Sequence, residues 1–361
     1  MMKTFFKKYL FLPIVIVSAA AYWLYPDSYP IYQESDHYSA QQQQFFNIVP
    51  DGEMDKSKLY GNLWEMIVDG EKFAPALPLP VEKPDFSAFL TPSEQMKFIW
   101  FGHSSLLVRS GAQTIFIDPV FAEYASPIPI MAKRFQPPPA GIDELPPVDV
   151  IIYSHNHYDH LDEEVVRHYV LQKTRFIVPL GMRVLLQKWG VTQDRIQELD
   201  WWQSVKLADV EVFAVPARHN TARGLFDRNK TLWAGYVLKS ATEQIYYSGD
   251  TSWGDGSQFK QIAQRFGYFD LVLVENGQYN PVWIDNHLLP QQTADAVSLL
   301  NAKRFMPVHW GAYPLALHPW DEPVKESLPL VKQRGIGVVT PLLGQVFDKE
   351  TKTTSWWLDV K

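Results

Sequence analysis

The chain of 361 residues contains no cysteine and, beyond its amino terminus, no block of basic residues. Without cysteine it can form neither disulfides nor thiolate metal sites, and it lacks the residue that carries a bacterial lipoprotein anchor. The formal net charge is −7, so nucleic acid is not an expected partner. Hydrophobic residues make up 46% of the chain, which is enough for one large domain or two modest ones.

An apolar run extends from residue 9 to residue 25 and is preceded by Lys3, Lys7 and Lys8. This pattern is typical of a cleavable export signal or of an uncleaved anchor. Small residues at 19–21 favour cleavage, whereas the largely aromatic stretch 22–25 suits a membrane interface. We expect an anchor with its positive end inside, and hence a membrane-anchored or exported protein of the bacterial cell envelope, folded outside the cytoplasm. A buried amino-terminal helix is a third interpretation.

Residues 26–95 are rich in proline, glutamine, tyrosine and acidic residues, and only 59–68 has a helical pattern. The proline-dense stretch 74–84 predicts an extended arm lying over a domain. From residue 96 to 361 the pattern changes to apolar runs separated by turn residues, which predicts a folded domain. We expect strands at 97–101, 104–108, 114–119, 148–153, 176–178, 210–215, 244–247, 271–274 and 304–308, and helices at 257–266, 290–300 and 323–333.

The segment most informative about chemistry is Ser154-His155-Asn156-His157-Tyr158-Asp159-His160-Leu161-Asp162. It follows the apolar run 148–153, which predicts a buried strand. It precedes an expected helix start with Asp162 as the N-cap. The segment therefore lies on the loop at the carboxyl end of a strand, where α/β proteins usually place their sites.

The spacing within this segment predicts metal binding. On an extended backbone, residues two apart face the same way, so His155 and His157 can bind one metal ion. Asp159 and His160 follow at a turn and are better placed for a second ion. The alternative is a polar loop of solvated histidines.

Three further candidate ligands, His219, Asp250 and His309, each follow the end of a predicted strand. Taken singly, an aspartate at a turn or a histidine at a sheet edge has an equally good structural explanation. Their shared placement at strand ends indicates a common site. Gly249 would let the backbone approach such a site closely.

These motifs together resemble the N-acyl-phosphatidylethanolamine phospholipase D-like branch of the metallo-β-lactamase-fold hydrolases. The resemblance covers residues 96–325 and leaves out the amino-terminal segment. It rests on Trp100-Phe101-Gly102-His103-Ser104, Asp118-Pro119-Val120-Phe121, the segment 154–162, Pro216-Ala217-Arg218-His219, Asp227-Arg228-Asn229 with Leu232-Trp233, Ser248-Gly249-Asp250 and Val308-His309-Trp310-Gly311.

The resemblance implies a four-layer αββα sandwich of two similar halves with a dinuclear zinc site at one edge of the sheets. The first ion would be held by His155, His157 and His219. The second would be held by Asp159, His160 and His309, with Asp250 bridging both. Seven nitrogen and oxygen ligands without sulfur suit Zn²⁺, and Mn²⁺ or Fe would also be accommodated.

The resemblance also implies roles in catalysis. Two ions about 3.5–4 Å apart would hold a bridging water as hydroxide. Asp159 and Asp250 would orient this nucleophile. His287, three residues before Pro290, matches a family histidine near the reacting phosphate and could donate a hydrogen bond or a proton, although it could also be an ordinary helix-entry residue.

Other residues have less certain roles. For His103 a hydrogen-bonded structural role is favoured over a ligand role, with a supporting position beside the ligands left open. Asp118 and Asp162 are candidates for orienting the ligands, and structural roles fit both equally well. The tryptophans could line an acyl groove, but ordinary packing is the favoured reading of Trp201, Trp202, Trp253, Trp283 and Trp310.

The sequence departs from the branch at 275–279 and 283–287, where a longer and more apolar stretch is expected. We therefore carry three functional hypotheses. The first is a zinc-dependent phosphodiesterase of the phospholipase D type acting on N-acyl-phosphatidylethanolamine-like phospholipids beside the membrane. The second is a metal-dependent hydrolase of another bond, such as a lactone or a small phosphodiester. The third is a catalytically inactive, membrane-tethered binding protein.

Overall fold

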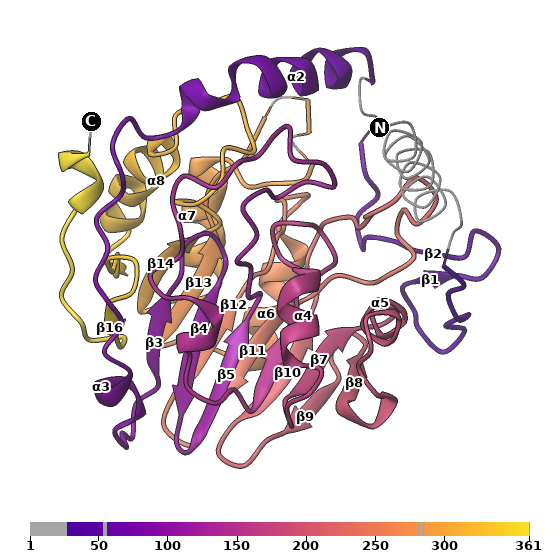
Figure 1. The fold of residues 1–361 in the computed structure, drawn as a ribbon, viewed down its shortest axis with the longest axis horizontal. Coiled ribbons are helices and arrows are strands. Elements are labelled where there is room, and N and C mark those ends of the chain that lie inside the picture. The colour runs from indigo at the N-terminus through magenta and orange to yellow at the C-terminus, as the bar shows by residue number, and fades with distance from the viewer. Residues whose placement is uncertain (1–26, 53–55, 281, 284, 361) are drawn as a thin grey trace, which may run out of the picture.

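Two mixed β-sheets pack face to face, and helices cover both outer faces, giving a four-layer α/β sandwich (Figure 1). The computed structural model describes residues 27–52, 56–280, 282–283 and 285–360. The architecture confirms the αββα fold that the motifs implied.

The first sheet has seven strands in the order β16-β3-β4-β5-β6-β7-β8. From one edge to the other, three antiparallel pairings are followed by three parallel pairings. Its strands are β3 (Lys97–Trp100), β4 (Leu106–Ser110), β5 (Gln113–Ile117), β6 (Val150–Ile152), β7 (Arg175–Pro179), β8 (Ile196–Leu199) and β16 (Val346–Phe347).

The second sheet repeats this pattern in the order β9-β10-β11-β12-β13-β14-β15. Again three antiparallel pairings precede three parallel ones, so the two halves of the domain are similar. Its strands are β9 (Ser204–Lys206), β10 (Glu211–Val215), β11 (Gly235–Lys239), β12 (Gln244–Tyr247), β13 (Leu271–Glu275), β14 (Arg304–Val308) and β15 (Gly337–Val338).

The central strands are buried on both faces, which explains their continuous apolar sequences. In β6, Val150 and Ile152 join the core between the sheets, whereas Ile151 joins a second core under the helices of the first sheet. Alternate side chains of a strand point to opposite faces, so neither face of β6 can be polar. All nine predicted strands are present, whereas the sequence analysis missed β8, β9, β11, β15 and β16, several of which are short or carry polar residues at a sheet edge.

Helices α4 (Glu163–Tyr169) and α5 (Arg183–Lys188) contribute to the core on the outer face of the first sheet. The outer face of the second sheet is covered by α6 (Ser257–Phe266), α7 (Pro290–Leu299) and α8 (Glu322–Gln333), as predicted. Pro290 begins α7, where a missing backbone N–H costs nothing. Short 3₁₀ helices occur at Gly70–Phe73, Ile142–Glu144, Gln193–Arg195 and Trp356–Asp359.

The segment before residue 96 packs against the sandwich. It contains a short hairpin of β1 (Tyr38–Ser39) and β2 (Gln44–Phe45), followed by α2 (Lys56–Asp69), which crosses one end of the molecule, and α3 (Phe86–Leu90) (Figure 1). Phe45 and Leu79 are buried in the core between the sheets. The boundaries at residues 25 and 95 stay predictions.

The prediction of a membrane-anchored or exported location is wrong. In the described part of the chain, no helix has the length and apolar character needed to cross a membrane. A span needs about 20 consecutive apolar residues, whereas the longest helix there, α2, has 14. Residues 1–25, on which that prediction rested, lie outside the described residues.

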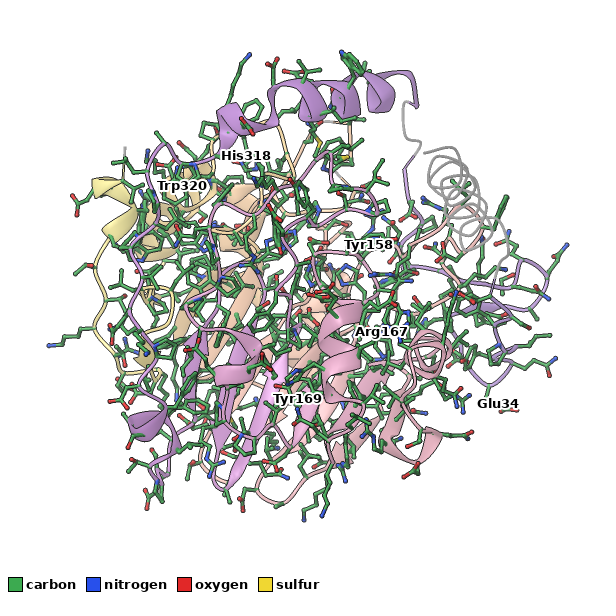
Figure 2. The ribbon with its side chains drawn as sticks, viewed as in Figure 1. Glu34, Tyr158, Arg167, Tyr169, His318 and Trp320 are labelled. Atoms are coloured by element: carbon green, nitrogen blue, oxygen red, sulfur yellow. The ribbon has the colours of Figure 1, made fainter. Side chains whose placement is uncertain are left out.

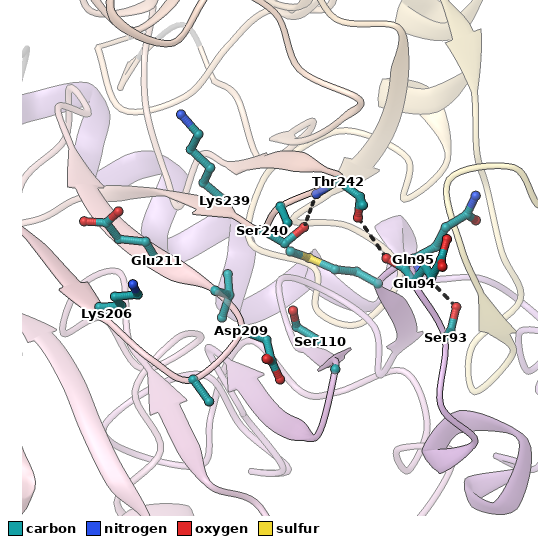
Figure 3. Close-up of a pocket in the computed structure, with 15 residues that line it drawn as sticks. Ser93, Glu94, Gln95, Ser110, Lys206, Asp209, Glu211, Lys239, Ser240 and Thr242 are labelled. Atoms are coloured by element: carbon teal, nitrogen blue, oxygen red, sulfur yellow. Dashed lines mark hydrogen bonds between the residues drawn. The ribbon is translucent and has the colours of Figure 1, made fainter.

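A cavity of about 630 Å³ opens among the turns after β4 and β11 and before β10 (Figure 3). Lysines and carboxylates are mixed around it, among them Lys206, Asp209, Glu211 and Lys239. These turns lie at the opposite strand ends from the predicted metal ligands. The cavity therefore contributes nothing to their site.

Candidate metal centre

The predicted ligands converge because the strands that precede them run in one direction within each sheet. In the first sheet β6 is parallel to β5, and in the second β10, β12 and β14 share one direction. Their carboxyl ends lie at one edge, and the loops that follow them meet there. Tyr158 of the histidine-rich loop lies beyond α4, toward the end of the molecule that α2 crosses (Figure 2).

Two hydrogen bonds join the sheets at this edge. The N–H of His103 donates to the carbonyl of Trp310 at 2.8 Å, and the N–H of His309 donates to the carbonyl of His103 at 3.0 Å. Gly249 allows a further close approach, since its φ is +56° and a Cβ there would lie 2.8 Å from the Cβ of Ser154. The loop that carries Asp250 is thereby held against the histidine-rich loop.

The first group of ligand atoms comes from His155, His157, His219 and Asp250, and these atoms lie within 4.8 Å of one another. Nδ1 of His157 is 2.9 Å from Nε2 of His155 and 3.1 Å from Nε2 of His219. Neutral imidazole nitrogens that face each other this closely need a shared proton or a common cation between them. The group has the donor chemistry and spacing of a metal site.

The second group comes from His103, Asp159, His160 and His309, whose ligand atoms also lie within 4.8 Å of one another. Oδ2 of Asp159 is 3.5 Å from Nε2 of His160 and 3.9 Å from Nε2 of His309. The structure thus brings together all seven predicted ligands in two neighbouring groups.

Asp250 lies between the two groups, with one carboxylate oxygen toward each. Its Oδ1 is 3.0 Å from Nε2 of His160 and 3.1 Å from Nδ1 of His309. Its Oδ2 is 3.6 Å from Nε2 of both His155 and His219. This is the arrangement that a carboxylate shared by two cations requires.

Burial keeps most rings of these groups neutral, whereas at His160 the effect of burial is outweighed by the carboxylates of Asp250 and Asp159, which raise the pKa of that ring well above its usual range. Burial lowers the pKa of His155, His219 and His309 well below the usual range, and that of His157 to about 4. A neutral imidazole is the form that binds a metal. Burial raises the pKa of Asp250 to about 6, which reflects the cost of a charged carboxylate in this setting.

Three buried polar atoms of the predicted ligands make no hydrogen bond of acceptable geometry within the described part of the chain, despite their short distances to one another: Nε2 of His160, Oδ1 of Asp250 and Nε2 of His309. A buried polar atom left unsatisfied costs about 1–3 kcal/mol. Divalent cations would satisfy all three atoms, so the residues present fit a metal centre.

Asp118 and Asp162, which the sequence could not separate, have different positions. Asp118 is completely buried, and its Oδ2 is 2.7 Å from Nδ1 of His160 and accepts a hydrogen bond from the hydroxyl of Tyr247 at 2.5 Å. Asp162 instead caps α4, accepting from the N–H of Glu164 at 2.9 Å. Asp118 orients a predicted ligand, whereas Asp162 stabilises the fold.

His287 lies beside both Asp250 and His309, with a ring nitrogen within 4.8 Å of their ligand atoms. Its ring stacks on that of His309 with centroids 4.9 Å apart. Nδ1 of His287 is 3.1 Å from Oε2 of Glu275, a fully buried carboxyl group that also accepts from the N–H of Leu288. The sequence analysis placed His287 near the site, whereas it noted Glu275 only within the stretch 275–279 that departs from the branch and gave it no role.

The sequence analysis also undervalued His103. Its ring is fully buried and its Nε2 is 2.8 Å from Oδ2 of Asp159. Burial lowers the pKa of His103 to about 4. His103 therefore supports a predicted ligand directly, and its place in the turn that follows β3 was the available signal.

The tryptophans considered for an acyl groove are mostly packing residues. Trp310 is buried and stacks in a cluster with Trp320 and Trp356. Trp201 is buried and donates to the carbonyl of Trp233. These contacts agree with the favoured reading of ordinary core packing.

Known proteins share these features. The family described as the Beta-lactamase superfamily domain matches residues 113–310, a span that includes all seven predicted ligands. An N-acyl-phosphatidylethanolamine-hydrolyzing phospholipase D of Caenorhabditis elegans is 32% identical over 267 residues, covering 69% of this chain and 74% of that protein. The chain is a metallo-β-lactamase-fold hydrolase of the N-acyl-phosphatidylethanolamine phospholipase D-like branch.

Other relatives of this hydrolase extend the comparison. An uncharacterized protein of Mycobacterium tuberculosis is 37% identical over 311 residues, covering 84% of this chain and 82% of that protein. Among solved structures, a metallo hydrolase of the archaeon Ignicoccus hospitalis superposes with a TM-score of 0.55 at 19% identity, covering 72% of this chain and all of that one. That likeness shows the shared fold. The family membership makes the chain a metal-dependent hydrolase, and the inactive binding protein is set aside.

Proposed function

We propose that this hydrolase binds two divalent metal ions, Zn²⁺ by preference, and cleaves the phosphodiester bond of N-acyl-phosphatidylethanolamine-like phospholipids in the manner of a phospholipase D. The binding of two ions is supported by the position of Asp250, whose two carboxylate oxygens face different groups of histidines. The motif set and the relative that hydrolyses N-acyl-phosphatidylethanolamine support the substrate class.

In this proposal one ion is held by His155, His157 and His219. The other is held by Asp159, His160 and His309, and Asp250 contributes to both. All donors are nitrogen or oxygen atoms, which suits Zn²⁺ and also accommodates Mn²⁺ or Fe. A pair of divalent cations supplies Lewis-acid activation of water and neutralises charge on a phosphoryl group.

The chain's own residues then position the reactants. Asp159 and Asp250 have carboxylate oxygens directed into the space between the histidines, where they orient the attacking water. Asp159 is held there by His103, and His160 is held by Asp118. Fixed ligands limit the reorganisation needed as charge develops in the transition state.

His287 acts on the substrate in this proposal. Burial raises the pKa of Glu275 well above its usual range, so its protonated carboxyl group donates to Nδ1 of His287, and the proton of the neutral ring then lies on Nε2, toward the phosphate or the leaving oxygen. A ring in this position donates a hydrogen bond or a proton to the departing group, a contribution of about 10²–10⁴-fold in rate.

A second candidate, a metal-dependent hydrolase of a lactone or a small phosphodiester, is favoured by one observation. The end of β13 and the segment after it, where the branch is expected to be apolar, hold the buried polar residues Glu275, Asn276 and Gln278. The amide of Gln278 also contacts the carbonyl of His309 at 3.4 Å. A polar wall beside the ligands suits a small polar substrate better than acyl chains.

One experiment separates the two candidates. Purified protein loaded with zinc is incubated with N-acyl-phosphatidylethanolamine in mixed micelles and, in parallel, with a soluble aryl phosphodiester and an aryl lactone. The proposal predicts phosphatidic acid and N-acylethanolamine in equal amounts, detected by mass spectrometry, and loss of both after chelation. If only the soluble substrates are hydrolysed, the second candidate function is correct and the phospholipase proposal is wrong.

A further inference from the structure

The arm that precedes the hydrolase domain reaches the candidate metal centre through Asn47. The side-chain amide of Asn47 donates to the carbonyl of His219 at 2.8 Å, and its Oδ1 accepts from the N–H of the same residue at 3.0 Å. Oδ1 also accepts from the indole N–H of Trp233 at 3.1 Å. Asn47 is 7% exposed and His219 is 1% exposed, so water does not compete for these bonds.

Asn47 satisfies both the backbone N–H and the backbone C=O of His219, as a neighbouring β-strand would. Residue 219 follows β10 in the loop 216–220, which has no regular secondary structure. A backbone outside a strand or helix has no ladder to fix it, so its N–H and C=O need partners from elsewhere. The residue that supplies them lies 172 positions earlier in the chain.

Arg218 also forms hydrogen bonds to this part of the arm. Its Nη2 donates to the carbonyl of Pro50 at 3.0 Å, and its Nη1 donates to the carbonyl of Asp285 at 3.0 Å. The carboxylate of Asp285 in turn accepts from the N–H of Gly52 at 2.8 Å. The arm, the loop of His219 and the loop that leads to His287 are therefore joined at one point.

The ring of His219 is held independently of its backbone. Its Nδ1 is 3.2 Å from the carbonyl of Asn286, which leaves Nε2 directed at His157 and Asp250. The ring contact fixes the rotation of the imidazole, whereas the backbone contact fixes the position of the main chain from which the side chain extends. Both are needed to place Nε2 within the tolerance of a metal bond.

We infer that Asn47 is a positioning residue of the first metal group, so that residues 47–52 of the arm form part of the hydrolytic centre and do not merely precede it. The inference rests on the proposed ligand role of His219. It predicts that losing the Asn47 contact weakens the binding of only one of the two metal ions. Within the described part of the chain, no hydrogen bond joins His160 or His309 of the second group to the arm.

The test measures metal affinity, not turnover. Full-length Asn47→Ala and wild-type protein are stripped of metal and titrated with Zn²⁺ against a chromogenic chelator, and with Co²⁺ while its visible absorption bands are recorded. Positioning contacts typically change metal affinity by about 10–100-fold. We expect one equivalent in Asn47→Ala to bind at least about 10-fold more weakly, with altered Co²⁺ bands, and the other to bind as in wild type.

Gln44→Ala is the matched control. Gln44 lies on the same arm and its amide donates to the carbonyl of Arg228 at 3.0 Å, so this variant loses an arm hydrogen bond of the same type away from His219. Both zinc affinities should stay at the wild-type values in Gln44→Ala. Equal weakening in the two variants would attribute the effect to a loosened arm and overturn the inference.

The remaining outcomes are also decisive. Wild-type affinities for both ions in a folded Asn47→Ala protein would overturn the inference alone. Absence of metal binding in wild type would instead overturn the proposed dinuclear centre. If Asn47→Ala does not fold, Asn47→Asp gives the same readout, because it keeps the acceptor for the His219 N–H but loses the donor to its carbonyl.

Discussion

Oδ2 of Asp118 lies 2.7 Å from Nδ1 of His160, and both side chains are completely buried. The contact fixes a proton on Nδ1 and leaves Nε2, which lies 3.0 Å from Oδ1 of Asp250, as the nitrogen available to a metal ion. A carboxylate in this position also makes the imidazole a stronger donor toward a metal. Asp118 itself has a φ of +41°, a conformation that a non-glycine residue adopts only when its surroundings hold it.

Replacing Asp118 with Asn should therefore weaken the binding of one metal ion by about 10–100-fold, since the ring of His160 then faces a neutral amide in place of a charged carboxylate. Zinc titration against a chelator measures the change. Asp162→Ala is the control: loss of the cap of α4 should cost about 0.5–2 kcal/mol of unfolding free energy and leave zinc affinity unchanged. Equal zinc affinity in Asp118→Asn and wild type would contradict the orienting role.

Asp250→Asn should reduce the bound metal from two equivalents toward one and lower kcat by about 10²–10³-fold or more, because a neutral amide can offer only one oxygen to the two groups. Metal content by mass spectrometry and rates on the active substrate measure the two effects. Circular dichroism controls for folding. Full metal content with full rate would refute the shared role of this carboxylate.

His287→Ala should behave differently, since this ring is proposed to act on the substrate. The expected result is two bound metal ions, as in wild type, with kcat lowered by about 10²–10⁴-fold. An activated aryl leaving group, which needs no proton from the enzyme, should recover much of the lost rate. Loss of a metal ion in His287→Ala would reassign the residue as a ligand.

The metal-free protein should lose stability as the pH falls from about 6.5 to about 4. Burial lowers the pKa of both His103 and His157 from 6.5 to about 4, so the unfolded chain takes up more protons than the folded one in this window. Each ring then contributes a loss on the order of 3 kcal/mol. The raised pKa values of Asp250 (about 6), Glu275 and Glu198 act in the opposite direction, but they are outnumbered by the site's histidines with lowered pKa values: His103, His155, His157, His219, His287 and His309.

Urea unfolding of chelator-treated protein at a series of pH values measures this dependence. The unfolding midpoint should fall steadily below about pH 6.5. His103→Gln removes one of the titrating rings and should flatten the curve. A midpoint that is constant or rises on acidification would show that these rings are not held neutral in the folded state.

Much of this site was readable from local sequence. His155, His157, Asp159 and His160 lie within six residues, and His219, Asp250 and His309 each follow an apolar run long enough to indicate a strand. A strand end is a local property, and parallel strands place such ends at one edge, so the sequence predicts both the donors and their meeting place. The three helices α6, α7 and α8 followed from local patterns as well, whereas the αββα fold was implied by the family resemblance of the motifs.

Other features depended on contacts between residues far apart in the chain. From the sequence, Asp118 and Asp162 are equally good candidates for orienting a ligand. Only the packing of β5 beside β6 places Asp118 against His160, whereas Asp162 caps a helix. The bond from Asn47 to His219 spans 172 positions and leaves no periodicity to detect. Local propensity and spacing decide which residues can serve as ligands, whereas the residues that hold those ligands are chosen by long-range packing, which a pattern of short period does not encode.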